Sequence, residues 1–96
     1  MNKSDEAGIL AKQAAELLSQ YDLESWAQAF NKLAATLNGP SRKQAAIEAL
    51  GMYGGMGSFS DLVVHFEGDA VIDGNNNLDQ IRQKLFISLR EIATVD

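Results

Sequence analysis

A stripe of apolar residues at helical spacing constrains the fold of this chain most strongly. Its members recur every three or four positions, as on the buried face of an amphipathic helix. They are Leu23, Trp26, Ala27, Phe30, Leu33, Ala34 and Leu37. The sequence Asn38-Gly39-Pro40 follows and predicts the end of the helix, because glycine tolerates the left-handed conformation there and proline cannot continue the hydrogen-bond ladder. An apolar face of this size must pack against other elements, so we interpret Trp26 and Phe30 as core residues.

Three further segments show helical periodicity. The first covers about residues 4–21, and the second starts at Pro40 and ends near Gly51. The third follows the polar sequence of residues 73–76. It is predicted to start at Asn77, because Asn77 and Gln80 have the spacing of a capping box. Its apolar positions are Leu78, Ile81, Leu85, Leu89 and Ile92. The chain is therefore predicted to be a mainly α, four-helix single domain over residues 1–96.

The segment between helices three and four can be interpreted in two ways. Residues 62–66 and 70–72 are apolar and β-branched enough to form strands, with a turn at 67–69. Two strands alone are marginally stable, so such a hairpin would depend on the helical core. The alternative is a short helix capped by Ser58, because Ser58 and Asp61 also have capping-box spacing. We expect a small β-hairpin or a short irregular insert here.

Negative charge is concentrated in one stretch of the chain. Residues 44–81 contain no Lys or Arg, and the acidic residues there are Glu48, Asp61, Glu67, Asp69, Asp73 and Asp79. The formal net charge of −5 therefore originates in this stretch, because acids and bases nearly balance elsewhere. Fixed charge of one sign speeds encounter with an oppositely charged partner. The stretch predicts a surface for a basic protein; the alternative is a contribution to solubility alone.

Composition also argues against several classes of partner. A sequence pI of 4.7 argues against nucleic acid, whose phosphates are bound by Lys and Arg. The sequence contains no apolar run near the ~20 residues that a membrane helix needs, so we expect no membrane partner. With no cysteine, disulfides and thiolate metal sites are excluded, and we expect a cytoplasmic location.

Catalytic and cofactor motifs are incomplete in this sequence. The glycine-rich residues 54–58 lack the Lys-Ser/Thr pair of a phosphate-binding loop. The acidic residues at 69–79 do not match the ligand positions of a calcium loop in either register. His65 is the only histidine, which is too few for a zinc site, and no nucleophile elbow accompanies the nearby serines. We predict a protein that is not an enzyme and has no metal or cofactor.

Four large side chains interrupt the glycine-rich segment: Met52, Tyr53, Met56 and Phe59. They can be packing residues, with glycines permitting a tight turn against the core. They can also be exposed apolar anchors among acids, which would suit the centre of an interface.

The run Tyr53-Gly-Gly-Met-Gly-Ser-Phe-Ser-Asp-Leu-Val-Val64 resembles the signature of a family of small bacterial proteins of unassigned function. That family has a Trp-bearing helix upstream, a glycine after the second helix and a closing helix of Leu-Asp-x-x-Arg type. Trp26, Gly39 and residues 78–82 correspond to these features. Ser60 departs from the family pattern, which has Asn at that position.

The resemblance implies a function. The family is similar to immunity proteins that protect bacteria from contact-dependent growth-inhibition toxins, one of them of the pancreatic-ribonuclease type. Such an active site is cationic, and an acidic inhibitor can occupy it as a phosphate surrogate. We therefore predict a basic protein partner, a toxin nuclease domain, and a chain that is monomeric when free. The predicted contacts are the acids Asp61, Glu67, Asp69 and Asp73, with Tyr53 and Phe59 as apolar anchors. The alternative is a helical interaction or regulatory module with no toxin partner.

Overall fold

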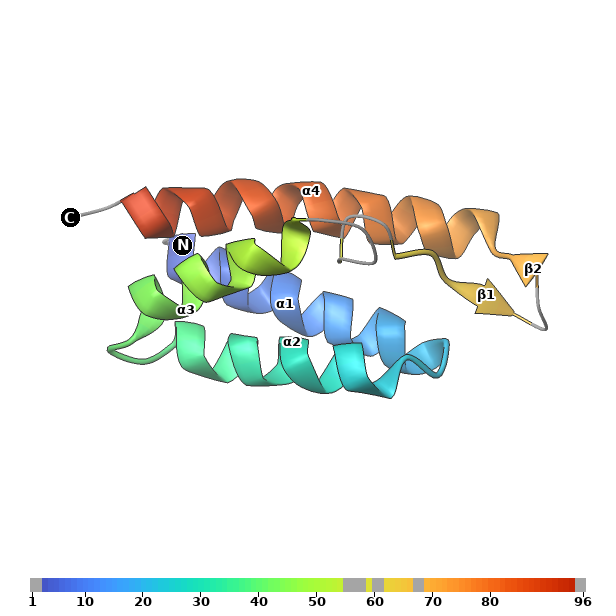
Figure 1. Ribbon diagram of the computed structural model, residues 1–96, viewed down its shortest axis with the longest axis horizontal. Coiled ribbons are helices and arrows are strands. Elements are labelled where there is room, and N and C mark those ends of the chain that lie inside the picture. The colour runs from blue at the N-terminus through green and yellow to red at the C-terminus, as the bar shows by residue number, and fades with distance from the viewer. Residues whose placement is uncertain (1–2, 55–58, 60–61, 67–68, 95–96) are drawn as a thin grey trace.

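Helices dominate the computed structural model, which describes residues 3–54, 59, 62–66 and 69–94 (Figure 1). The elements are α1 (Lys3–Gln20), α2 (Glu24–Leu37), α3 (Arg42–Leu50), the 3₁₀ turn η1 (Gly51–Tyr53), β1 (His65–Phe66), β2 (Asp69–Ala70) and α4 (Ile72–Thr94). The predicted mainly α, four-helix fold is confirmed. No helix within the described residues combines the length and apolar character needed to cross a membrane.

Helix α1 lies between α2 and α4, and α3 packs on α4 (Figure 1). The face of α1 toward its neighbours is rich in alanine, and small side chains let helix axes approach closely. The predicted stripe of α2 is buried at five positions, including Phe30 and Leu37, which are fully buried. The largest fully buried side chains are Phe30, Phe59, Leu18, Leu37, Leu78, Leu85, Leu89 and Val64. A single apolar core therefore joins the four helices to the segment that precedes β1.

The strands are shorter than the sequence suggested. Among the described residues of this segment, His65–Phe66 and Asp69–Ala70 pair, antiparallel, with His65 opposite Ala70 and Phe66 opposite Asp69. One further hydrogen bond continues this register, from the Val71 N–H to the Val64 carbonyl at 3.2 Å. The strand expected over 62–66 is limited to His65–Phe66. The strand expected over 70–72 is instead Asp69–Ala70, so Asp69 belongs to a strand rather than to the predicted turn, and Ile72 already belongs to α4.

The predicted start of the last helix at Asn77 is wrong, since α4 begins at Ile72. Residues 73–77 are poor helix formers, which is why the sequence suggested a turn. Contacts with the rest of the molecule override this propensity. Gly74 is buried against Tyr21, and a Cβ there would lie 2.7 Å from the tyrosine hydroxyl oxygen. Asn75 binds the backbone beside β1 through its side chain.

Candidate partner-binding surface

Three segments meet at one end of the molecule: the turn between α1 and α2, the paired strands, and the first turn of α4 (Figure 1). The turn reverses the chain at Asp22, whose φ of 63° lies in the left-handed region that aspartate adopts more readily than most residues. The contact between Tyr21 and Gly74 joins this turn to the start of α4. Residues more than 50 positions apart in sequence therefore share one surface.

Negative charge gathers at this end, which we call the acidic end. Its described segments are residues 20–25, 62–66 and 69–79, and they contain acids and one histidine but no Lys or Arg. The exposed acidic side chains are Asp22, Glu24, Asp73 and Asp79. Asp79 is paired with Arg82 at 3.2 Å, so its charge is partly neutralised. Asp22 and Glu24 lie outside the acidic stretch of the sequence, and only the fold brings them to it.

Helix termini modulate this charge. α2 and α4 both begin at the acidic end, where the partial positive charge of a helix N-terminus favours acidic groups. Glu24 and Asp73 occupy the first turns of these helices. Glu24 also accepts a hydrogen bond from the Ser19 hydroxyl at 2.9 Å. These two acids therefore stabilise their helices as well as contributing to the surface.

Two apolar side chains are exposed at the same end. Val63 is 45% exposed and Ile72 is 77% exposed, although valine and isoleucine are usually buried. Val64, between Val63 and β1, is fully buried, so the alternation of an extended segment turns Val63 outward. Val63 precedes Val64 and Ile72 follows Val71, and a backbone hydrogen bond joins Val64 to Val71. Exposed apolar residues at an end whose charged side chains are acidic suit the centre of an interface.

Phe59, predicted as an exposed anchor, is instead fully buried. Its ring lies 4.6 Å from that of Phe30, 5.7 Å from that of Trp26 and 5.3 Å from that of Tyr53, measured between centroids. A ring surrounded in this way cannot contact a partner without disruption of the core. Of the two interpretations made from the sequence, packing is correct for Phe59, and the anchor interpretation is wrong.

Tyr53 belongs to the same aromatic cluster. It is half-buried, its ring lies 5.0 Å from that of Phe86, and its hydroxyl donates a hydrogen bond to the Arg82 carbonyl at 2.9 Å. Burial raises the pKa of the Tyr53 hydroxyl well above its usual value, and the nearby charge of Arg82 opposes this only in part. The hydroxyl is thus held as a neutral donor, so Tyr53 serves packing more than recognition.

This pKa predicts a loss of stability in alkali. A raised pKa in the folded state means that the unfolded chain releases the Tyr53 proton first, near pH 10, so the free energy of unfolding falls as pH rises beyond that value. Tyr53→Phe should lose about 1 kcal/mol at pH 7, from the missing hydrogen bond, and show a shallower decline from pH 9.5 to 11. Urea denaturation at each pH measures both. Parallel curves for the two proteins would contradict the prediction.

Arg82 organises the segment between the aromatic cluster and β1. Its side chain is 12% exposed, and its guanidinium donates to the carbonyls of Phe59 at 2.8 Å and Leu62 at 3.0 Å. The same guanidinium lies over the Phe59 ring, 5.3 Å from the centroid. Sequence reasoning missed this role. The available signal was that position 82 falls on the apolar face of the last helix, where a cation must find acceptors.

The predicted acidic contacts are only partly placed. Asp61 and Glu67 lie outside the described residues, and the backbone of Asp69 belongs to β2. Asp73 is exposed in the first turn of α4. Hence the fold brings Asp69 and Asp73 to the acidic end and adds Asp22 and Glu24 to them.

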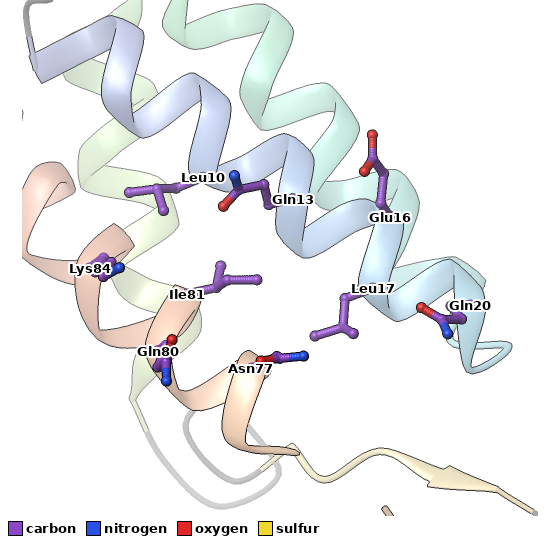
Figure 2. A pocket seen from close by; sticks show the side chains of 9 residues that line it. All are labelled: Leu10, Gln13, Glu16, Leu17, Gln20, Asn77, Gln80, Ile81 and Lys84. Carbon is purple, nitrogen blue, oxygen red and sulfur yellow. The ribbon is translucent and has the colours of Figure 1, made fainter. Parts of the chain in front are cut away.

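A groove of about 350 Å³ runs between α1 and α4, ending near the acidic end (Figure 2). Leu10, Leu17 and Ile81 form its apolar floor. The polar side chains on its walls are Gln13, Glu16, Gln20, Asn77, Gln80 and Lys84. Four of these six are carboxamides, which donate and accept hydrogen bonds but do not titrate near neutral pH. This chemistry suits binding better than acid–base catalysis.

Among the described residues, no group of three His, Cys, Asp or Glu side chains could hold a metal ion. His65 is exposed on β1, next to the buried Val64.

Comparison with protein families gives one match. A domain of unknown function (DUF6966) matches residues 19–72, more than half of the chain. The chain belongs to this family. The matched DUF6966 segment covers α2, α3 and both strands, and it ends at the first residue of α4. Arg82 and all the groove-lining residues except Gln20 lie outside the segment. Neither the curated proteins nor the solved structures contain a match to this sequence.

Proposed function

We propose that this protein is a cytoplasmic immunity protein that binds a basic toxin domain, a nuclease, and covers its cationic active site with the acidic end. The observation that carries the proposal is that the segments holding the exposed acids Asp22 and Asp73 and the exposed apolar residues Val63 and Ile72 lie at one end of the molecule. The resemblance of the central motif to immunity families supports the same function. Membership in DUF6966 is compatible with it, since that family carries no assigned activity.

The mechanism is steric occlusion guided by charge. A nuclease site attracts phosphate and therefore exposes Lys and Arg, which the carboxylates of the acidic end can pair with. Long-range attraction raises the association rate, whereas packing of the apolar centre slows dissociation. Val63 and Ile72 take the anchor role that the sequence had suggested for Tyr53 and Phe59. The aliphatic stem of an arginine can lie on such a pair while its charged head reaches Asp73.

Charge reversal tests this surface. Asp22→Lys/Asp73→Lys should weaken binding to the toxin domain about 30-fold at low salt, mainly through slower association, and should flatten the dependence of affinity on salt. The measurement is surface-immobilised binding kinetics between about 50 and 500 mM NaCl. A matched control is Glu6→Lys/Glu48→Lys, which changes net charge equally at two exposed residues on α1 and α3. Equal losses in the two double variants would place the interface elsewhere.

A second candidate function rests on the groove between α1 and α4. Its lining residues include one acid, Glu16, and one base, Lys84, so the formal charge of the groove is zero. A regulatory or interaction module that binds a partner there would show affinity that is independent of salt. Retention of a partner at 500 mM NaCl, with loss on Leu17→Glu, would favour this candidate over the immunity function.

A further inference from the structure

Asn75 connects the start of α4 to the segment beside β1 through one carboxamide. Its Oδ1 accepts a hydrogen bond from the Val64 N–H at 2.8 Å. Its Nδ2 donates to the Val64 carbonyl at 3.1 Å and to the Val71 carbonyl at 2.7 Å. The side chain therefore uses its acceptor and its donors at once, and it binds two residues that face each other in the hairpin register.

The hairpin needs such a connection. A ladder of two residues in each strand is marginally stable on its own. The residues bound by Asn75 are those next to the exposed apolar pair: Val64 follows Val63, and Val71 precedes Ile72. Any change in the distance between Val64 and Val71 moves the two exposed side chains relative to each other.

We infer that Asn75 is a positioning residue for the partner-binding surface, holding Val63 and Ile72 at a fixed spacing before the partner arrives; this rests on the proposed immunity function. A preformed apolar pair avoids the entropic cost of ordering the hairpin during association. Asparagine suits the position because aspartate would supply only acceptors, facing two carbonyl oxygens, and alanine would supply neither donor nor acceptor.

The test compares Asn75→Ala and Asn75→Asp with Asn38→Ala. Asn38 is a matched control because its Nδ2 donates one hydrogen bond, at 3.2 Å, to the Ala34 carbonyl. It caps the C-terminus of α2, which lies at the opposite end of the molecule from the strands (Figure 1). Amide hydrogen exchange by NMR reports on the hydrogen bond between the Val64 N–H and Asn75 without any partner. In Asn75→Ala, protection of the Val64 N–H should fall at least about tenfold, whereas Asn75→Asp should preserve much of it through the remaining acceptor. Asn38→Ala should leave it unchanged.

Binding kinetics with the product of the gene immediately upstream, the toxin expected under the proposed function, then test the positioning role. Asn75→Ala and Asn75→Asp should dissociate about ten times faster than wild type, with association rates within about twofold, and Asn38→Ala should match wild type. Unchanged exchange of the Val64 N–H in Asn75→Ala would overturn the inference that Asn75 holds the Val64 backbone. Reduced protection with unchanged dissociation would overturn the positioning role and leave the proposed function intact. Absence of a wild-type complex would overturn the proposed function, whatever the exchange data show.

Discussion

Phe59→Ala is expected to destabilise the fold by about 4 kcal/mol, because it removes a fully buried ring and leaves a cavity that its neighbours cannot fill. Phe30, Trp26 and Tyr53 all pack on this ring. Each aromatic pair contributes beyond simple burial, so the loss exceeds that from an aliphatic residue of similar area. For a chain of 96 residues, such a loss lowers the melting temperature by about 20 °C.

Urea denaturation followed by circular dichroism measures this loss. Ile87→Ala is the control, because Ile87 is 57% exposed on α4 and its truncation should cost less than about 0.5 kcal/mol. A cost below about 1 kcal/mol for Phe59→Ala would show that the Phe59 ring is not a core residue. Its interpretation as an exposed anchor would then have to be restored.

Arg82→Met should cost about 3 kcal/mol. Methionine fills much of the volume, but the carbonyls of Phe59 and Leu62 lose charge-assisted hydrogen bonds in a site that is 12% exposed. Arg82→Lys should recover less than half of this, because an ammonium group lacks the planar fork that reaches two carbonyls together. The free energy of unfolding from urea denaturation is the readout for both variants.

Arg90 provides the matched control for Arg82. It is an exposed arginine on the same helix, and its guanidinium lies 5.8 Å from the Phe86 ring centroid. Arg90→Met should cost less than about 1 kcal/mol, because an exposed cation–π contact is weak. Similar losses of unfolding free energy at the two positions would mean that the hydrogen bonds from Arg82 to the backbone contribute no more to stability than a surface contact does.

The helices could be predicted because their evidence is local. The stripe from Leu23 to Leu37 and its stop at Asn38-Gly39-Pro40 indicate one element without reference to any other. The start of α4 could not be predicted in this way. Ile72 to Asn77 is helical because Gly74 fits under Tyr21 and Asn75 binds Val64, and both contacts involve residues more than ten positions away.

The candidate surface was predictable only in part. The acidic stretch indicated Asp69 and Asp73, but Asp22 joins them through a turn that lies about 50 residues earlier. Phe59 was assigned to the surface as an apolar anchor among acids, whereas it packs on the aromatic cluster and its carbonyl accepts a hydrogen bond from Arg82. Periodicity carries no information on such contacts, because they join segments without a regular repeat.

The most direct test is co-expression of this chain with the product of the gene immediately upstream, followed by affinity purification at increasing salt. We expect a stable complex with a basic C-terminal domain, inhibition of the nuclease activity of that domain, and release of the domain as NaCl rises from about 0.1 to 1 M. At about 0.1 M NaCl, the Asp22→Lys/Asp73→Lys variant should retain less of this domain than the wild-type chain does. Absence of a complex, or a complex unaffected by both salt and charge reversal, would contradict the proposal that the acidic end neutralises a toxin.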